Sequence, residues 1–199
     1  MTPRGKPDAA LYRVRYEALS LLEEQSQDGV IDLFYGDESS VSEEGYVPYG
    51  WQFKDESVRI EVAKGQRLNC FGLISRQNQL HYATTSGSIT AAFVVNQLEN
   101  LSWKLTKPTV VVLDNARIHT ADKVRQRLVD WHQRGLYVFY LPPYSPHLNL
   151  AERLWKELKA RWLRPEDYQT SNHLFYAVWL ALAAVGRELF IGFGAFKST

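Results

Sequence analysis

Three acidic residues, Asp37, Asp114 and Glu152, stand at comparable places in this sequence of 199 residues. Asp37 follows a short apolar run at 30–36, Asp114 follows the β-branched run TVVVL at 109–113, and Glu152 follows a proline-rich turn. Clustered carboxylates repel one another unless a cation lies among them, and oxygen-only ligands suit Mg²⁺ or Mn²⁺. Two such ions about 4 Å apart activate a water and stabilise the leaving oxygen of a phosphodiester. Metal-dependent phosphodiester chemistry is therefore the hypothesis that these residues raise.

Each acid also has a structural interpretation, which is the better one when the acid is considered alone. Asp37 could begin a turn, and Asp114 with Asn115 could close a strand in an Asx turn. Glu152 lies three residues after Asn149, which is the spacing of a capping box at a helix N-terminus. Three acids that each stand at the end of an element together favour a shared site.

The stretch LPPYSPHLNLAERLW, at 141–155, is expected to position Glu152. The rings of Pro142, Pro143 and Pro146 fix φ and remove three backbone donors, so neither a helix nor a sheet ladder continues through them. Asn149 stands where a helix cap belongs, and an amphipathic helix is predicted from there on. The stiff loop would hold Glu152 on the first turn of that helix.

Hydrophobic periodicity predicts an alternation of helices and strands. The helices are expected at 9–25, 86–105 (with Ser88 as a cap), 120–134, 150–163 and 171–189. The strands are expected at 30–36, 67–75, 79–84, 109–113 and 137–141, with a hairpin turn at 76–78 and a long loop at 39–66 that includes a possible strand at 58–63. This order predicts an α/β fold with a mixed sheet flanked by helices on both faces. Sites in open α/β sheets gather at strand C-terminal ends.

Composition narrows the class of protein. The single cysteine, Cys70, excludes a disulfide framework and a cysteine-based zinc site, and it suits a reducing cytoplasm. No signal peptide is visible, and the longest apolar run, at 174–185, is too short to span a bilayer, so no membrane partner is expected. The net charge is +1, but residues 114–164 hold ten Lys/Arg against five Asp/Glu. That excess indicates either solvated helix faces or a basic surface beside an acidic site. The second arrangement would attract a phosphodiester substrate.

Four segments carry a resemblance to a known family. LPPYSPHLNLAERLW at 141–155 and VVVLDNARIH at 110–119 resemble two signature motifs of DDE transposases, in the bacterial insertion-sequence branch of the mariner superfamily. LFYGDES at 33–39 resembles the first-aspartate motif, and YVPYGW at 46–51 resembles the aromatic segment that follows it. The motifs stand in the family's order and cover most of residues 30–165. The motif around Glu152 is the most specific of the four.

The resemblance implies a ribonuclease-H-like fold in which Asp37, Asp114 and Glu152 bind metal. It also implies Mg²⁺- or Mn²⁺-dependent cleavage at transposon ends, with two ions, followed by joining of the freed 3′-hydroxyl to target DNA. A homodimer, acting on paired ends, and a bacterial, nucleoid-associated location in the cytoplasm are further family expectations. On this view residues 1–29 are a tail and linker helix, and residues 30–199 are the DDE catalytic domain with its C-terminal helices.

Three departures from the family pattern stand out. Leu150 replaces the usual proline after the asparagine of the third motif, but proline at the first helical position is favourable without being required. The 37 residues between Asp114 and Glu152 are slightly more than the common mariner spacing. Family members usually carry N-terminal helix-turn-helix domains, whereas about thirty residues precede the first predicted strand here. Recognition of the element's ends is therefore expected from another polypeptide or another part of the gene.

The remaining candidate residues have weaker signals. Arg117, Lys156 and Lys159 are candidates for phosphate contacts, with a solvated surface as the equal alternative. His119 is a candidate for a DNA contact or proton transfer, with a structural hydrogen bond at least as well supported. Two other functions stay open: an inactive or domesticated fragment that binds DNA or a partner, and a nuclease of the same fold without strand joining.

Overall fold

The structure is a computed structural model that describes residues 8–43, 66–194 and 196. Two sequence predictions, the possible strand at 58–63 and the aromatic segment at 46–51 with Trp51, lie outside the described residues. In the part of the chain that is described, no helix is both long enough and apolar enough to cross a membrane.

Five strands form one mixed sheet in the order β3-β2-β1-β4-β5. Their bounds are Asp32–Ser42 (β1), Arg67–Ile74 (β2), Leu80–Thr85 (β3), Thr109–Leu113 (β4) and Leu136–Tyr140 (β5). β1, β2 and β3 pair antiparallel, whereas β4 is parallel to both β1 and β5. The predicted hairpin is present, and Asn78 takes a positive φ of 63° in its turn.

Strand β1 is longer than the sequence indicates. It was expected to end before Asp37, but it continues to Ser42 and includes the first residues of the segment expected as a loop. β1 pairs with β4 only over residues 32–35, while its pairing with β2 runs from Tyr35 to Ser42. Because the second half of β1 has only one neighbouring strand, its residues are mostly half-buried and polar, so they lack an apolar strand signal.

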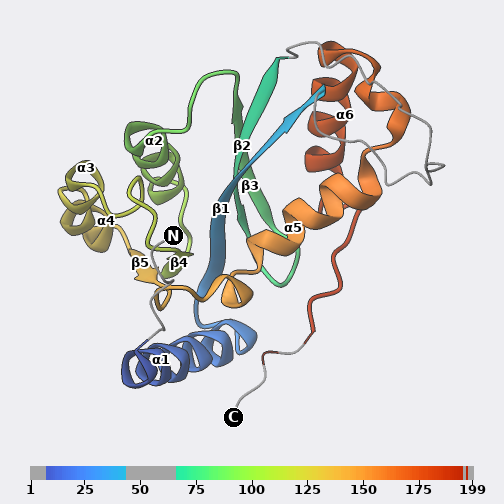
Figure 1. Ribbon diagram of the computed structural model, residues 1–199. Helices are drawn as coiled ribbons and strands as arrows, with labels where there is room; N and C mark the ends of the chain where they lie inside the picture. Colours follow the sequence, from blue (N-terminus) through green and yellow to red (C-terminus); the bar gives the residue numbers. More distant parts are fainter. Residues whose placement is uncertain (1–7, 44–65, 195, 197–199) are drawn as a thin grey trace.

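Helices cover both faces of the sheet, as predicted (Figure 1). On one face lie α2 (Ala91–Ser102), α3 (Asp122–Arg125) and α4 (Leu128–Gln133), which pack with alternate strand residues such as Val111 and Leu113. On the other lie α1 (Ala9–Gln27), α5 (Ala151–Glu157) and α6 (Ser171–Ala184), which pack with Val110 and Val112. A period of two along each strand produces these two hydrophobic clusters.

Helix α1 packs directly on the sheet. Leu19 is fully buried, and the buried Glu23 accepts hydrogen bonds from the Tyr35 hydroxyl and from Arg76, whose Nε lies 2.6 Å from Glu23 Oε2. Gly29, with a φ of 74°, lets the chain turn after the helix, close to the predicted stop. The division of the chain at residues 29 and 30 remains a prediction.

The helices differ from the sequence prediction in four details. The segment expected as one helix at 120–134 is two short helices, because Arg127 N–H bonds the carbonyl of Val124 in a tighter turn. Thr90, not Ser88, caps α2 by accepting from Phe93 N–H at 3.3 Å. The last predicted helix ends at Ala184, not at 189. The helix predicted at 150–163 continues beyond α5 as a π-helix over Leu158–Trp162.

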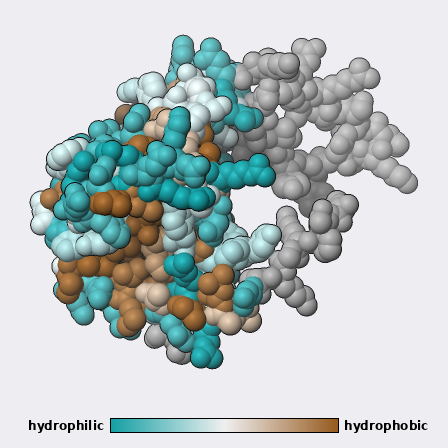
Figure 2. Space-filling view, turned by 90° about the vertical axis from the view of Figure 1, so that its left-hand side faces the viewer, coloured by the Kyte–Doolittle hydropathy of each residue, from teal (hydrophilic) through white to brown (hydrophobic). Residues whose placement is uncertain are grey.

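Hydrophobic side chains remain exposed on the outer surface. Figure 2 shows the face that lies on the left of Figure 1, where hydrophobic residues gather in the lower half. Leu11, Val14 and Leu21 of α1 are exposed, as are Val129 of α4 and Tyr137 of β5. Scattered exposed apolar residues are normal, but a gathered set indicates an interaction surface.

Candidate active site

The register of the sheet places Asp37 level with Asp114. Tyr35 pairs with Val112 in the parallel ladder, so two residues further on Asp37 and Asp114 stand opposite each other at the point where β1 and β4 diverge. Tyr35 and Val112 face the layer of α1, α5 and α6, and Asp37 and Asp114 each follow one of them by two residues. Side chains alternate along strands, so both carboxylates are directed to the same face of the sheet.

Asn149 fastens the start of α5 to β1 beside Asp37. Its Nδ2 donates to the carbonyl of Gly36 at 3.0 Å, and its Oδ1 accepts from Ala151 N–H at 3.1 Å. The side chain thus satisfies a free donor of the first helical turn and holds that turn against the strand, although the N-cap position of α5 is Leu150 and not the predicted Asn149. The backbone N–H of Asn149 donates to Pro146 O at 2.7 Å, so the capping-box interpretation of Glu152 is not realised.

A cavity of about 380 Å³ lies where these elements meet, and Asp37, Asp114 and Glu152 all line it. The rest of its wall is Asn115, Leu141, Asn149 and the proline turn from Pro142 to Pro146. The structure therefore brings the three predicted acids to one cavity. Within the described residues, no three His, Cys, Asp or Glu side chains already converge as a ligand set for a metal ion.

The two aspartates differ in their electrostatics. Burial, together with the nearby carboxylates of Glu38, Asp114 and Glu152, raises the pKa of Asp37 to about 7, against the lowering effect of a backbone hydrogen bond at Glu38. The hydrogen bond from His119 holds the pKa of Asp114 below its ordinary value. The cavity thus contains repelling acids of which one, Asp37, is poorly compensated within the protein.

His119 lies inside the protein and not on its surface. Its side chain is fully buried, with Nδ1 2.7 Å from Asp114 Oδ1 and Nε2 3.2 Å from Glu38 Oε2, although the second contact lacks good hydrogen-bond geometry. These two carboxylates raise the pKa of His119 to about 9 against the lowering effect of burial. Tyr140 donates to its carbonyl at 2.8 Å. The contacts favour the structural interpretation of His119, as a residue that orients Asp114.

Asp114 also forms the Asx turn considered as its structural interpretation. Its Oδ1 accepts from Ala116 N–H at 2.9 Å, while Asn115 Nδ2 donates to Leu141 O at 2.5 Å. These bonds tie the end of β4 to the end of β5 and leave half of the Asp114 side chain exposed. The structural and the metal-binding roles of Asp114 are therefore compatible.

The predicted phosphate-binding residues are placed differently from one another. Arg117 and Lys156 are exposed, whereas Lys159 is half-buried. Burial lowers the pKa of Lys159, and nearby Cys70 and Asp37 oppose that shift. Two other cations of the basic window, Arg127 and Arg134, are bound to Glu99 at 2.8 and 2.5 Å, so they hold α4 against α2 and do not form a wall beside the acids.

Sequence reasoning missed three features of the site. Gly72 pairs with Asp37, and the ring of Trp155 packs so closely on it that a Cβ would lie 3.0 Å from two ring carbons. The bond from Asn149 to β1 joins residues 113 positions apart, which no local pattern reveals. Tyr144, in the proline turn, has a φ of 59° and an exposed ring that lines the cavity. Such backbone strain in a side-chain-bearing residue clusters at functional sites.

Comparisons with known proteins show the family of this chain. Residues 32–174 match the family model described as a DDE superfamily endonuclease. A curated relative, the insertion element IS630 uncharacterized 39 kDa protein of Shigella sonnei, is 26% identical over 157 residues, which cover 77% of this chain and 43% of the relative. The chain thus spans less than half the length of that protein.

Solved structures share the fold at low sequence identity. The Mos1 mariner paired-end complex with Mn matches with a TM-score of 0.53 and 16% identity over 94% of this chain and 62% of that chain. A simian T-cell lymphotropic virus intasome in complex with the PP2A regulatory subunit B56 gamma matches with a TM-score of 0.54 and 13% identity. The match covers 80% of this chain and 50% of that chain. The predicted ribonuclease-H-like fold is confirmed. With a family model that matches most of its length, the chain belongs to the DDE superfamily of endonucleases.

Proposed function

We propose that this chain is the catalytic domain of a transposase that cleaves DNA at transposon ends and joins the freed 3′-hydroxyl to target DNA. The observation that carries the proposal is the cavity lined by Asp37, Asp114 and Glu152. Membership of the endonuclease family supports it, as do the names of two similar proteins, an insertion element and a Mos1 transposase paired-end complex.

The proposed cofactor is a pair of divalent cations, either Mg²⁺ or Mn²⁺. The donors of the cavity are carboxylate oxygens, which suit these hard cations. Burial, and to a smaller extent the neighbouring carboxylates, raise the pKa of Asp37, and a bound divalent cation would favour its ionised form. Glu152 is exposed on the first turn of α5, so its side chain is able to turn toward Asp37 and Asp114. When bound, the metals would activate water and stabilise the leaving oxygen.

The protein's own residues have distinct roles in this proposal. Asp37 and Asp114 hold the metals from the sheet, and Glu152 completes the set from α5. His119, buried behind Asp114, fixes the orientation of that carboxylate through the 2.7 Å bond. Lys156, one turn after Glu152 on α5, contacts a phosphate of the DNA strand where that strand leaves the cavity. Lys159, half-buried near Asp37, and Arg117, exposed after Asp114, are proposed as further phosphate contacts.

The proposed partners are DNA, a second copy of the chain and a helix-turn-helix module. Transposon ends and target DNA are the substrates, and the relatives described as paired-end complexes support them. A homodimer is supported by the hydrophobic residues gathered on one face (Figure 2). The chain spans 43% of the curated relative, so a separate helix-turn-helix module that recognises the ends is consistent with that greater length. A nucleoid-associated cytoplasmic location remains a prediction.

A cleavage assay tests the proposal. Wild-type protein and Asp114→Asn are incubated with labelled DNA that carries element ends, in Mg²⁺, in Mn²⁺ and in EDTA. The proposal expects metal-dependent nicking by the wild type and none by the variant. Equal nicking by both proteins would refute the assigned acids, and its cause would be a contaminating nuclease or a different site.

The two alternative functions give different results in the same assay. A nuclease of the same fold would nick the DNA but would not join the 3′-ends to a target plasmid. An inactive fragment would bind DNA without any metal-dependent product. Joined products that disappear in Asp114→Asn would exclude both alternatives.

A further inference from the structure

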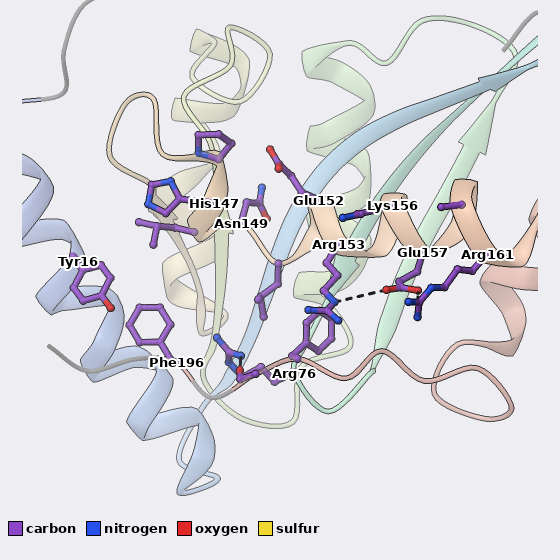
Figure 3. A pocket seen from close by; sticks show the side chains of 16 residues that line it. Tyr16, Arg76, His147, Asn149, Glu152, Arg153, Lys156, Glu157, Arg161 and Phe196 are labelled. Atoms are coloured by element: carbon purple, nitrogen blue, oxygen red, sulfur yellow. Dashed lines mark hydrogen bonds and ion pairs between the residues drawn. The ribbon is translucent and has the colours of Figure 1, made fainter. Parts of the chain in front are cut away.

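A second groove, of about 650 Å³, adjoins the acid cavity. Figure 3 shows it between α1, α5 and the C-terminal segment that includes Phe193 and Phe196. Pro146, Asn149 and Glu152 line both this groove and the acid cavity, so the two share a rim at the start of α5. A strand whose phosphate lies among the three acids would reach this groove directly at that rim.

The α5 side of the groove is cationic. Arg153, Lys156 and Arg161 line it, and Glu157 lies between the two arginines, 3.8 Å from Arg153 Nε and 3.2 Å from Arg161 NH1 (Figure 3). The arginine side chains are 51% and 74% exposed, so each guanidinium keeps donors for a phosphate beyond its shared contact with Glu157. Residues 152 to 157 of α5 span about 7.5 Å along the helix, at 1.5 Å for each residue.

The opposite side of the groove is aromatic. The rings of Tyr16 and Phe196 stack with centroids 5.2 Å apart, and the guanidinium of Arg76 lies 5.7 Å from the centroid of the Phe196 ring. His147, from the proline turn, extends this wall, held by Tyr12, whose hydroxyl lies 3.1 Å from His147 Nε2. Figure 3 shows Tyr16 and Phe196 together on the α1 side of the groove, apart from the α5 cations.

We propose that this groove binds a single-stranded segment of DNA that continues from the strand held in the acid cavity. Cations that follow the backbone and aromatic rings that stack on bases are the combination by which proteins hold single strands. Both kinds of side chain line this one groove of about 650 Å³. The inference rests on the proposed DNA-cleaving function, and it adds that the DNA beside the cut is unpaired.

The charge of the groove agrees with this ligand. Its lining holds three cationic side chains on the α5 side, Arg153, Lys156 and Arg161, against two acids, Glu152 and Glu157. A fourth cation of the lining, Arg76, is paired with the buried Glu23. Glu152 lies at the shared rim, so cations predominate away from the acid cavity. A phosphodiester backbone that leaves the acids would therefore meet positive potential along α5.

Binding measured without cleavage tests the inference. Fluorescence anisotropy in EDTA compares a labelled ten-nucleotide single strand with a duplex of the same length, for the wild type, Arg161→Gln and Phe196→Leu. We expect the single strand to bind the wild type more tightly than the duplex. Phe196→Leu should weaken single-strand binding by about 5- to 150-fold, the range for one stacked base. Arg161→Gln should reduce the slope of log affinity against log salt by about 0.7.

A matched control carries the same loss of charge elsewhere. Lys104, exposed after α2 on the opposite face of the sheet, is replaced in Lys104→Gln, which should bind the single strand as the wild type does. Thermal unfolding confirms that each variant is folded, and Arg161→Gln, at an exposed site, decides the question if Phe196→Leu is unstable. Unchanged single-strand affinity and salt slope in Arg161→Gln, or losses equal to those of the control, would overturn the inference.

The inference and the proposed function fail in different ways. If the wild type cuts DNA but the groove variants bind the single strand normally, the inference that the groove binds single strands is wrong and the proposed cleavage function stands. If the variants lose single-strand binding but the wild type cuts no DNA under any metal condition, the groove binds single strands and the cleavage function is wrong.

Discussion

Replacing Gly72 by alanine should displace α5 from the sheet and with it Glu152. Gly72 pairs with Asp37 across β1 and β2, and the ring of Trp155 packs on its Cα. An added Cβ would lie 3.0 Å from Cζ2 and Cη2 of Trp155 and 3.3 Å from Cδ2 of Leu154. All of these distances are shorter than the 3.5–4.0 Å of a relaxed carbon contact.

The magnitude follows from these distances. Relief of the contact requires a shift of roughly 0.5–1 Å by α5 or by the ring of Trp155. Overpacking of this kind costs about 1–3 kcal/mol of unfolding free energy. Glu152 lies one helical turn before Trp155, so the displacement reaches its carboxylate. A misplacement of about 1 Å lowers the rate of a positioned reaction by up to roughly 100-fold.

Urea unfolding and the nicking assay measure the two effects separately. Gly192→Ala is the control, because a Cβ at Gly192 meets nothing within 4 Å and its φ is not positive. The double variant Gly72→Ala with Trp155→Phe should recover part of both losses, because the smaller ring vacates the space, and a double-mutant cycle quantifies the coupling. Wild-type stability and nicking in Gly72→Ala would refute the idea that this contact sets the position of α5.

Three further predictions concern charge and backbone. Asp37→Asn should raise the unfolding free energy by roughly 1–3 kcal/mol at pH 8 in EDTA, measured by urea unfolding. The sign follows from its pKa, raised from 3.8 to about 7, because the folded protein binds the extra proton and loses stability as the pH rises through that window. Glu99→Gln should lower the unfolding free energy by about 2 kcal/mol at pH 7, because hydrogen bonds from Arg127, Arg134 and Trp131 lower the pKa of Glu99 to about 2 against the opposing effect of burial. The difference in unfolding free energy between the wild type and this variant should shrink as the pH falls from 4.5 toward 2. A difference that stays constant over this range would count against the pairing of Glu99 with the arginines. Gly186→Ala should lower the thermal midpoint, since φ is +76° and a Cβ would lie within 2.4 Å of Asn78 O; an unchanged midpoint would contradict that geometry.

The sequence predicted the elements whose signal is local. The β-branched run of β4 is fully buried between two parallel neighbours, and its apolar character alone identified it. The proline turn before α5 also has a local signal, since φ is fixed by the rings themselves. The mixed sheet and the two helical layers followed from the order of these elements.

Features set by long-range contacts could not be predicted from the sequence. The second half of β1 pairs only with β2, so polar residues such as Ser39 and Ser40 form a strand without an apolar pattern. As a polar residue next to the second acid, His119 was a candidate for a DNA contact. In the structure it is buried between the carboxylates of Glu38 and Asp114, which come from two different segments. The approach of Trp155 to Gly72 depends on how α5 crosses the sheet, which depends on the whole fold.

A crystal structure of the protein with Mn²⁺, measured at a wavelength that gives anomalous signal from manganese, tests the central claim most directly. The account predicts anomalous density in the cavity, with Mn²⁺ bound at roughly 2.0–2.3 Å to carboxylate oxygens of Asp37, Asp114 and Glu152. Manganese bound elsewhere, or held without one of these three acids, would contradict it.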